Sequence, residues 1–181
     1  MLTPLQIQKL TKFFSMYDTN CDGFLDQEDF KEIVKSLANL KHLGTRSPKY
    51  LILKERFDRA WTNLKNHADS NHDKHVSLEE WLTYYDQVLL DESLYQQELH
   101  SLMEIVFEIF DDNGDGKISP DEWGNLLKIY HVSPIYAPQV FQQLDHNQDG
   151  FLDRAEIMDL IYRFFYSDDP QDLANRMFGP Y

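Results

Sequence analysis

Residues 145–156 read Asp-His-Asn-Gln-Asp-Gly-Phe-Leu-Asp-Arg-Ala-Glu, with carboxylate or amide side chains at the first, third, fifth, ninth and twelfth positions. The same Asp-x-Asn-x-Asp opening, with an acid at the twelfth position, recurs at 18–29, 69–80 and 111–122. One such cluster of polar residues also forms ordinary turns. Four copies with one spacing instead indicate a structural repeat that gathers oxygen atoms around one point.

This spacing is that of the EF-hand loop, in which oxygen atoms from positions 1, 3, 5, 7, 9 and 12 surround Ca²⁺. Position 7 contributes its backbone carbonyl, and position 6 turns sharply and favours glycine. We therefore expect three or four bound Ca²⁺. Whether the number is three or four depends on loop 69–80. The predicted metal ligands are Asp18, Asn20, Asp22, Phe24, Asp26, Asp29, Asp69, Asn71, Asp73, His75, Glu80, Asp111, Asn113, Asp115, Lys117, Glu122, Asp145, Asn147, Asp149, Phe151, Asp153 and Glu156.

Apolar residues at helical spacing stand on both sides of every loop. Before the first loop the series is Leu10, Phe13, Phe14 and Tyr17. Thr3 and Pro4 are the predicted N-cap and first residue of that helix. Two helices for each loop predict an all-α fold of eight main helices, arranged as four helix-loop-helix units in two pairs.

The eighth residue of each loop is apolar. We expect these residues to join the loops in pairs through short β-bridges, the first loop with the second and the third with the fourth. The residues concerned are Leu25, Val76, Ile118 and Leu152.

The helical pattern is interrupted near 41–49, where Gly44 and Ser47-Pro48 occur, and again near 90–93. These breaks predict an N-terminal EF-hand pair at 1–90, a C-terminal pair at 91–166 and a tail at 167–181. We expect the two halves to pack together in one compact body instead of hanging on a linker.

The charge balance excludes several classes of partner. The chain carries 17 Lys and Arg against 31 Asp and Glu, a formal net charge of −14, so it repels nucleic acid and anionic membrane surfaces. We expect neither nucleic-acid binding nor a membrane span. Cys21 is the sole cysteine, so no internal disulfide forms. With no secretory pattern at the N-terminus, we expect a cytoplasmic protein.

Two loops depart from the usual pattern. Loop 18–29 ends in Asp29, and its shorter side chain makes bidentate coordination harder, which suits six-coordinate Mg²⁺. The hypothesis is a mixed Ca²⁺/Mg²⁺ site. Loop 69–80 has Lys74 at the turn, where a non-glycine residue costs about 1 kcal/mol and adds a cation. We expect binding there to be weakened by about ten- to a hundred-fold without being lost.

Particular residues point to one group of EF-hand proteins. They are Asp29, the segment from Ala60-Trp61 to Glu80-Trp81, and the tail from Asp168-Asp169-Pro170 onward. Together with the long spacing between the first two loops, they resemble the invertebrate sarcoplasmic calcium-binding proteins and their neuronal relative calexcitin. The resemblance implies a compact eight-helix protein that buffers Ca²⁺ and Mg²⁺ in the cytosol. It also implies a tail that folds back over the core through Leu173, Met177 and Phe178.

The same superfamily includes calcium-triggered photoproteins that hold coelenterazine in a central cavity. The resemblance implies a His and a Trp on the helix before the tail for that function. This chain has Ile161 and Phe165 there, which argues against light emission and leaves the presence of a cavity open.

The methionine content favours a buffer over a sensor. Sensors of the calmodulin type expose a methionine-rich groove, whereas the 5 methionines of this chain are scattered. We predict a non-enzymatic, monomeric Ca²⁺/Mg²⁺ buffer. The alternative is a calexcitin-like sensor that changes conformation and binds a target protein in signalling.

Overall fold

The computed structural model describes residues 1–111, 113–133, 135 and 137–179. Its helices and strands are α1 (Pro4–Tyr17), β1 (Phe24–Leu25), α2 (Gln27–Leu40), α3 (Pro48–Ala68), β2 (Val76–Ser77), α4 (Leu78–Val88), α5 (Glu92–Leu94), α6 (Ser101–Phe110), β3 (Lys117–Ile118), α7 (Pro120–Ile129), α8 (Ala137–Leu144), β4 (Leu152–Asp153) and α9 (Arg154–Tyr166). The eight predicted main helices are α1 to α4 and α6 to α9, so the all-α prediction is confirmed.

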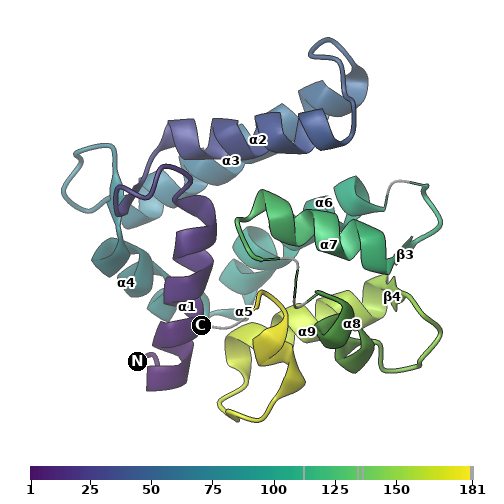
Figure 1. Cartoon of the computed structure of the whole chain (residues 1–181). Coiled ribbons are helices and arrows are strands. Elements are labelled where there is room, and N and C mark those ends of the chain that lie inside the picture. The colour runs from purple at the N-terminus through teal and green to yellow at the C-terminus, as the bar shows by residue number, and fades with distance from the viewer. Residues whose placement is uncertain (112, 134, 136, 180–181) are drawn as a thin grey trace.

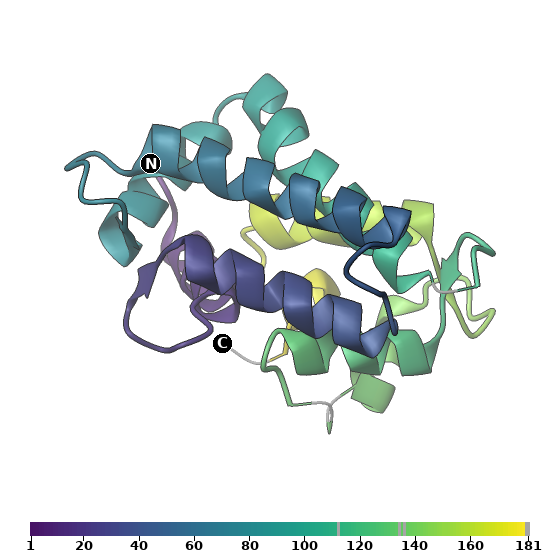
Figure 2. The same cartoon turned by 90° about the horizontal axis from the view of Figure 1, so that it is seen from above.

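The two halves form one body. Helices α1 and α9, α2 and α7, and α3 and α6 are in contact, and each pair joins the N-terminal half to the C-terminal half. Figure 1 shows α2 and α3 side by side at the top, with the loops of the N-terminal half on the left and the loops next to β3 and β4 on the right. Figure 2 gives the same separation of the two loop pairs. The predicted compact packing is confirmed.

The first helix begins where its sequence predicts. Thr3 is the N-cap of α1, and its Oγ1 accepts a hydrogen bond from the Gln6 backbone N–H at 3.2 Å. The Gln6 side chain returns the contact by accepting the Thr3 N–H at 3.0 Å. This reciprocal pair satisfies two donors that a helix start otherwise leaves unpaired, and Pro4 follows at the position where its missing N–H costs nothing.

The predicted β-bridges are confirmed in both halves. Strands β1 and β2 are antiparallel and pair Leu25 with Val76, and β3 and β4 pair Ile118 with Leu152. All four side chains are at most 2% exposed. Each bridge therefore ties two loops together and anchors the pair in the core.

The structure adds helical residues that the sequence patterns did not predict. Helix α5 starts after Asp91, whose Oδ1 accepts the N–H of Ser93 at 2.8 Å, and a π-helical segment at Tyr95–His100 continues it into α6. Tyr95 and Leu99 are the buried residues of that segment. Two apolar residues four positions apart form too short a series to indicate a helix from sequence.

The tail is held to α1 by hydrogen bonds. Lys9 is fully buried, and its Nζ donates to the Ser167 carbonyl at 2.6 Å and to Asn175 Oδ1 at 3.3 Å. Thr3 Oγ1 also donates to the Asp168 carboxylate at 2.6 Å. Burial lowers the pKa of Lys9, while the nearby acids Asp172 and Asp168 oppose that shift. Because these partners lie more than 150 positions apart in sequence, they join the two ends of the fold.

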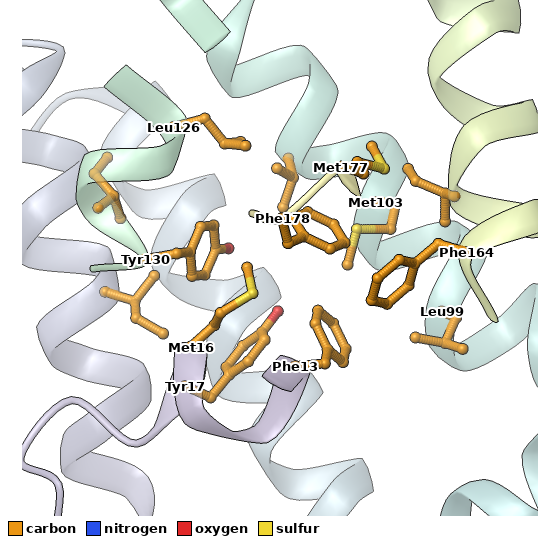
Figure 3. Close-up of a cluster of buried hydrophobic side chains, with 14 of the residues drawn as sticks. Phe13, Met16, Tyr17, Leu99, Met103, Leu126, Tyr130, Phe164, Met177 and Phe178 are labelled. Atoms are coloured by element: carbon orange, nitrogen blue, oxygen red, sulfur yellow. The ribbon is translucent and has the colours of Figure 1, made fainter. Parts of the chain in front are cut away.

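The end of the tail fills the centre of the molecule. Met177 and Phe178 are 2% and 4% exposed, and Phe178 packs on Phe164 with ring centroids 5.0 Å apart. Figure 3 shows both tail residues among side chains that come from α1, α6 and α9. The folded-back tail is thus confirmed, but Leu173 is a correction. It is 36% exposed because the 3₁₀-helical turn at Leu173–Arg176 directs Ala174 and Asn175 inward instead.

The space beside the tail is small. An apolar cavity of about 30 Å³ lies between α6, α7, α9 and the tail and is lined in part by Trp123, Ile161 and Phe178. That volume leaves room for water-sized groups only. Ile161 and Phe165 are both at most 2% exposed and belong to the packed core. This cavity is therefore too small for an organic ligand the size of coelenterazine.

None of the helices in the described part of the chain has the length and apolarity needed to cross a bilayer.

The aromatic core predicts an alkaline limit to stability. Burial raises the pKa of Tyr17, Tyr84, Tyr85, Tyr95, Tyr130 and Tyr166, in the case of Tyr130 and Tyr166 to about 12. A raised folded-state pKa stabilises the fold fully below the unfolded pKa of about 10, and that contribution is lost as the pH rises. We expect these hydroxyls to ionise together with unfolding. Of the 10 tyrosines, these six should contribute to the absorbance at 295 nm in the same step as the change in circular dichroism, above about pH 10. Ionisation of more than four tyrosines ahead of unfolding would contradict this.

Candidate metal centres

The four loops share a left-handed backbone at two positions. The sixth position has positive φ in each, at 87° for Gly23, 72° for Lys74, 79° for Gly116 and 87° for Gly150. Lys74 therefore adopts the strained turn that its position predicted. The fourth position is also left-handed in each loop, which the sequence did not reveal. The residues there are Cys21, His72, Gly114 and Gln148, with φ between 58° and 72°. Since these four residues share no side-chain type, nothing in the sequence indicated a left-handed backbone at this position.

The aspartate at the first position points into its own loop. In loop 18–29, Asp18 accepts the N–H of Asp22 at 3.1 Å and that of Gly23 at 3.0 Å, one at each carboxylate oxygen. Asp69 and Asp111 make the same two contacts in their loops. In these three loops the backbone N–H groups of the fifth and sixth positions therefore face the carboxylate of the first position.

The third and fifth positions repeat a second set of contacts. The Asn Oδ1 at position 3 accepts the N–H of position 5 at 2.8 to 2.9 Å in every loop. The Asp Oδ1 at position 5 accepts the N–H of position 7 at 2.8 to 2.9 Å. These contacts hold the side chains of the third and fifth positions against the backbone of their own loop, in the same way in all four loops.

The ninth and twelfth positions form the start of the helix that leaves the loop. Asp26, Ser77, Ser119 and Asp153 are the N-caps of α2, α4, α7 and α9, and the twelfth residue completes a capping box in each. Ser77 and Ser119 were not among the predicted ligands, although they hold the same place as the two aspartates. A serine hydroxyl is a weaker ligand than a carboxylate, which is why the acid pattern alone missed them.

The acids at the twelfth position differ in their surroundings. Burial alone would raise the pKa of Glu80, but hydrogen bonds from Ser77 and Ser70 outweigh it and hold that pKa at about 2. Asp29 is 1% exposed, and burial raises its pKa despite hydrogen bonds from Asp26 and Thr19. Asp29 is thus more buried than the glutamates that hold the twelfth position in the other three loops.

The donor set fits a hard cation. Within the described residues no three Asp, Glu, His or Cys side chains already form a metal-binding cluster, because the carboxylates are turned onto backbone N–H groups. In loop 145–156, however, Asp145 Oδ1 is buried and finds no hydrogen-bond partner among the described residues. A buried carboxylate oxygen without a donor is costly unless a cation faces it. Carboxylate and amide oxygens are the ligands that Ca²⁺ prefers.

Lys117 brings a positive charge to a neighbouring loop. Predicted to offer only its carbonyl, it extends its Nζ to Asp149 Oδ2 at 2.6 Å and over the ring of Phe151 at 5.3 Å. The hydrogen bond from Lys117 lowers the pKa of Asp149. An ion in loop 145–156 would therefore compete with the Lys117 ammonium group for the Asp149 carboxylate.

The turn of the second loop gives a prediction. Replacing Lys74 by glycine removes left-handed strain worth about 1 kcal/mol, so the free energy of unfolding should rise by that amount. Loss of the cation should also tighten calcium binding at loop 69–80 by roughly tenfold, equivalent to about 1.4 kcal/mol. Urea unfolding and calcium titration measure the two effects. Lys74→Ala is the matched control, because it removes the charge but keeps the strain. Unchanged affinity in both variants would contradict the assignment.

Comparison with known proteins covers both halves of the chain. The family described as "EF-hand domain pair" matches residues 7–85, and the family described as "EF hand" matches residues 102–127 and 139–161. Sarcoplasmic calcium-binding proteins I, III and IV of Branchiostoma lanceolatum are 25% identical over 98% of this chain and 98% of their own length. Calexcitin-1 of Caenorhabditis elegans is 22% identical over 97% of this chain and 87% of its own length.

A further match is partial. Calcium-dependent protein kinase 4 of Plasmodium falciparum is 28% identical over 87% of this chain, which spans only 28% of the kinase. Among solved structures, a sarcoplasmic calcium-binding protein from amphioxus aligns with a TM-score of 0.81 at 24% identity, over 100% of both chains. That likeness confirms the fold.

Proposed function

The chain belongs to the EF-hand family and is a calcium-binding protein related to the sarcoplasmic calcium-binding proteins and calexcitin, and from that premise we propose that it is a Ca²⁺/Mg²⁺ buffer. The observation that carries the proposal is a hydrogen bond common to all four loops, in which the third-position Asn Oδ1 accepts the N–H of the fifth position, so that the loops share one arrangement of their carboxylate and amide side chains. We propose that each loop takes one divalent cation through the residues predicted above, with Ser77 and Ser119 added at their ninth positions.

The proposed mechanism is reversible chelation. The first, third, fifth and twelfth side chains exchange backbone N–H partners for the ion, and the carbonyl of the seventh residue joins them. Because the ninth and twelfth residues also cap the outgoing helix, uptake of the ion and order in that helix are coupled. We assign no catalysed reaction to the chain. The kinase that it resembles matches over only 28% of its length.

The closed core supports a buffer over a sensor. Met16, Met103 and Met177 are at most 5% exposed and pack in the interior, so they do not line an open groove. Met177 and Phe178 of the tail lie among buried side chains that come from both halves (Figure 3). A sensor would have to expose apolar surface on binding calcium. We further propose that the protein is a cytoplasmic monomer with EF-hand pairs at 1–90 and 91–166 and a tail at 167–181.

The buffer proposal is tested with the dye ANS, which binds exposed apolar surface. We expect its fluorescence with the protein to fall when calcium is added, because the ion closes and orders the loops. A rise would favour the calexcitin-like alternative, a sensor that opens a surface for a target protein. Repeating the titration at about 1 mM Mg²⁺ should weaken the calcium response of a buffer.

The first loop is proposed to select between the two metals. Asp29→Glu adds one methylene, which allows bidentate coordination, and should raise the preference for Ca²⁺ over Mg²⁺ at that loop by about tenfold. Competition calorimetry measures the ratio. Glu80→Asp makes the reverse change in the paired loop and should shift that loop toward Mg²⁺. If neither ratio moved, the twelfth residue would not set the selectivity.

A further inference from the structure

One segment of this acidic chain is basic. Residues 41–59 hold six Lys and Arg and two acids, in a chain with a net charge of −14. Lys54 pairs with Asp58, and Arg59 pairs with Glu55 at 3.1 Å. Arg46, Lys49 and Arg56 are exposed and form no ion pair within the described residues. The segment comprises the α2–α3 connection and the first half of α3, which projects at the upper right of Figure 1.

The same segment exposes apolar surface beside a groove. Leu51 and Ile52 on α3 are 54% and 55% exposed. Ile52 also lines a groove of about 260 Å³ between the α2–α3 connection and the end of α6, with Leu43 and Ile109 as further apolar walls. Figure 2 shows that connection, in dark blue, next to the teal end of α6. Lys41 and Lys49 stand at the groove.

We propose that this surface is a docking site for an acidic segment of a partner protein, which inserts an apolar side chain into the groove. The residues that form this surface are Arg46, Lys49, Ile52 and Arg56. The positive charge and the apolar groove are complementary to such a segment. The proposal goes beyond the buffer function and stands whether or not the loops exchange magnesium.

An acidic peptide fits better than an anionic membrane. A bilayer presents an extended negative surface, and Glu108 and Asp111 at the groove would repel it. A short peptide meets only the charges within about 8 Å, the screening distance at physiological salt. The groove is also concave and can receive an apolar side chain of a peptide, whereas a flat bilayer would meet only the exposed Leu51 and Ile52. Its volume suits a single large side chain.

The groove shares a wall with the third loop. Asp111, the first residue of loop 111–122, lines the groove together with Glu108. Lys41 Nζ donates to the Phe110 carbonyl at 3.3 Å, one residue before that loop. An ion on Asp111 would neutralise a charge that repels an acidic partner. We therefore expect calcium to tighten docking, and docking to tighten calcium binding by the same factor. This link rests on the proposed calcium site in loop 111–122.

A peptide-display selection on the intact chain tests the proposal. A random twelve-residue library is selected on the wild type at 1 mM Ca²⁺ and counter-selected on Lys49→Glu/Ile52→Asp. We expect enrichment of Asp and Glu around a Leu, Phe or Trp. The synthetic form of the most enriched sequence should bind the wild type at least tenfold more tightly than Arg46→Glu/Lys49→Glu. Lys35→Glu/Lys128→Glu is the matched control, since it reverses two charges at exposed sites outside the groove.

Several results would overturn the proposal. They are a selection without acidic enrichment, a peptide that binds all variants equally, and binding to 30% phosphatidylserine vesicles in place of peptides. The substituted side chains are exposed, so the variants should be as stable as the wild type. Unfolding curves check this and separate a loss of binding from misfolding. A peptide affinity that is equal in calcium and in EGTA, both with 1 mM Mg²⁺, would overturn the link to loop 111–122 while leaving the docking site standing.

Discussion

Truncation of Phe178 to alanine is expected to lower the free energy of unfolding by about 3 to 5 kcal/mol, the usual cost of deleting a buried aromatic side chain. Phe178 is 4% exposed and packs against Phe164 and against Phe13, whose ring centroid is 6.0 Å away. It therefore joins the tail to both α1 and α9. Its loss would open a cavity at the place where the two halves meet, and urea unfolding measures the effect.

The same tail supplies the control. Leu173→Ala removes a side chain that is 36% exposed, so we expect a loss below about 1 kcal/mol. Both variants lie within six residues of each other and outside the four loops. If Phe178→Ala lowered the free energy of unfolding no more than Leu173→Ala, the tail would not anchor the core.

Removal of calcium is expected to have the second large effect. Binding to the native state alone stabilises it by about 4 kcal/mol for each site when the free ion exceeds its dissociation constant a thousandfold. For a chain of this size that corresponds to a fall in Tm on the order of 10 °C for each site emptied. Fourteen carboxylates occupy ligand positions, and without the ion they repel one another. Thermal unfolding in calcium and in EGTA measures the difference.

Salt separates the two causes of this loss. Raising the ionic strength in EGTA screens repulsion between exposed carboxylates and should restore only part of the stability. Adding calcium back should restore all of it. A Tm that is the same in calcium and EGTA would contradict calcium binding by the folded chain.

The loops were predictable because their chemistry is local. Twelve residues with acids at set positions specify both the turn and the bridge, so the pairing of Leu25 with Val76 followed from the sequence. The eight main helices followed from apolar series on either side. The positive φ at the fourth position was not predictable, because Cys21 and His72 share no property that a turn demands.

Contacts between distant segments were beyond sequence patterns. Nothing in the surroundings of Lys9 in sequence indicates that it is buried against the carbonyl of Ser167. Leu173 has the apolar character of a core residue, yet a 3₁₀-helical turn leaves it exposed. The ion pair of Lys117 with Asp149 likewise arises only because the bridge between β3 and β4 brings their loops together. Each depends on where the chain returns, which periodicity does not encode.

Calcium titration calorimetry with loop variants tests the central claim, that these loops hold the ions. Wild type should bind three or four Ca²⁺, and Glu122→Gln and Glu156→Gln should each abolish one tight binding event, because a neutral amide cannot replace the twelfth carboxylate. The double variant should lose two. A wild type that takes up no calcium, or variants that bind as many ions as tightly as the wild type, would contradict the account.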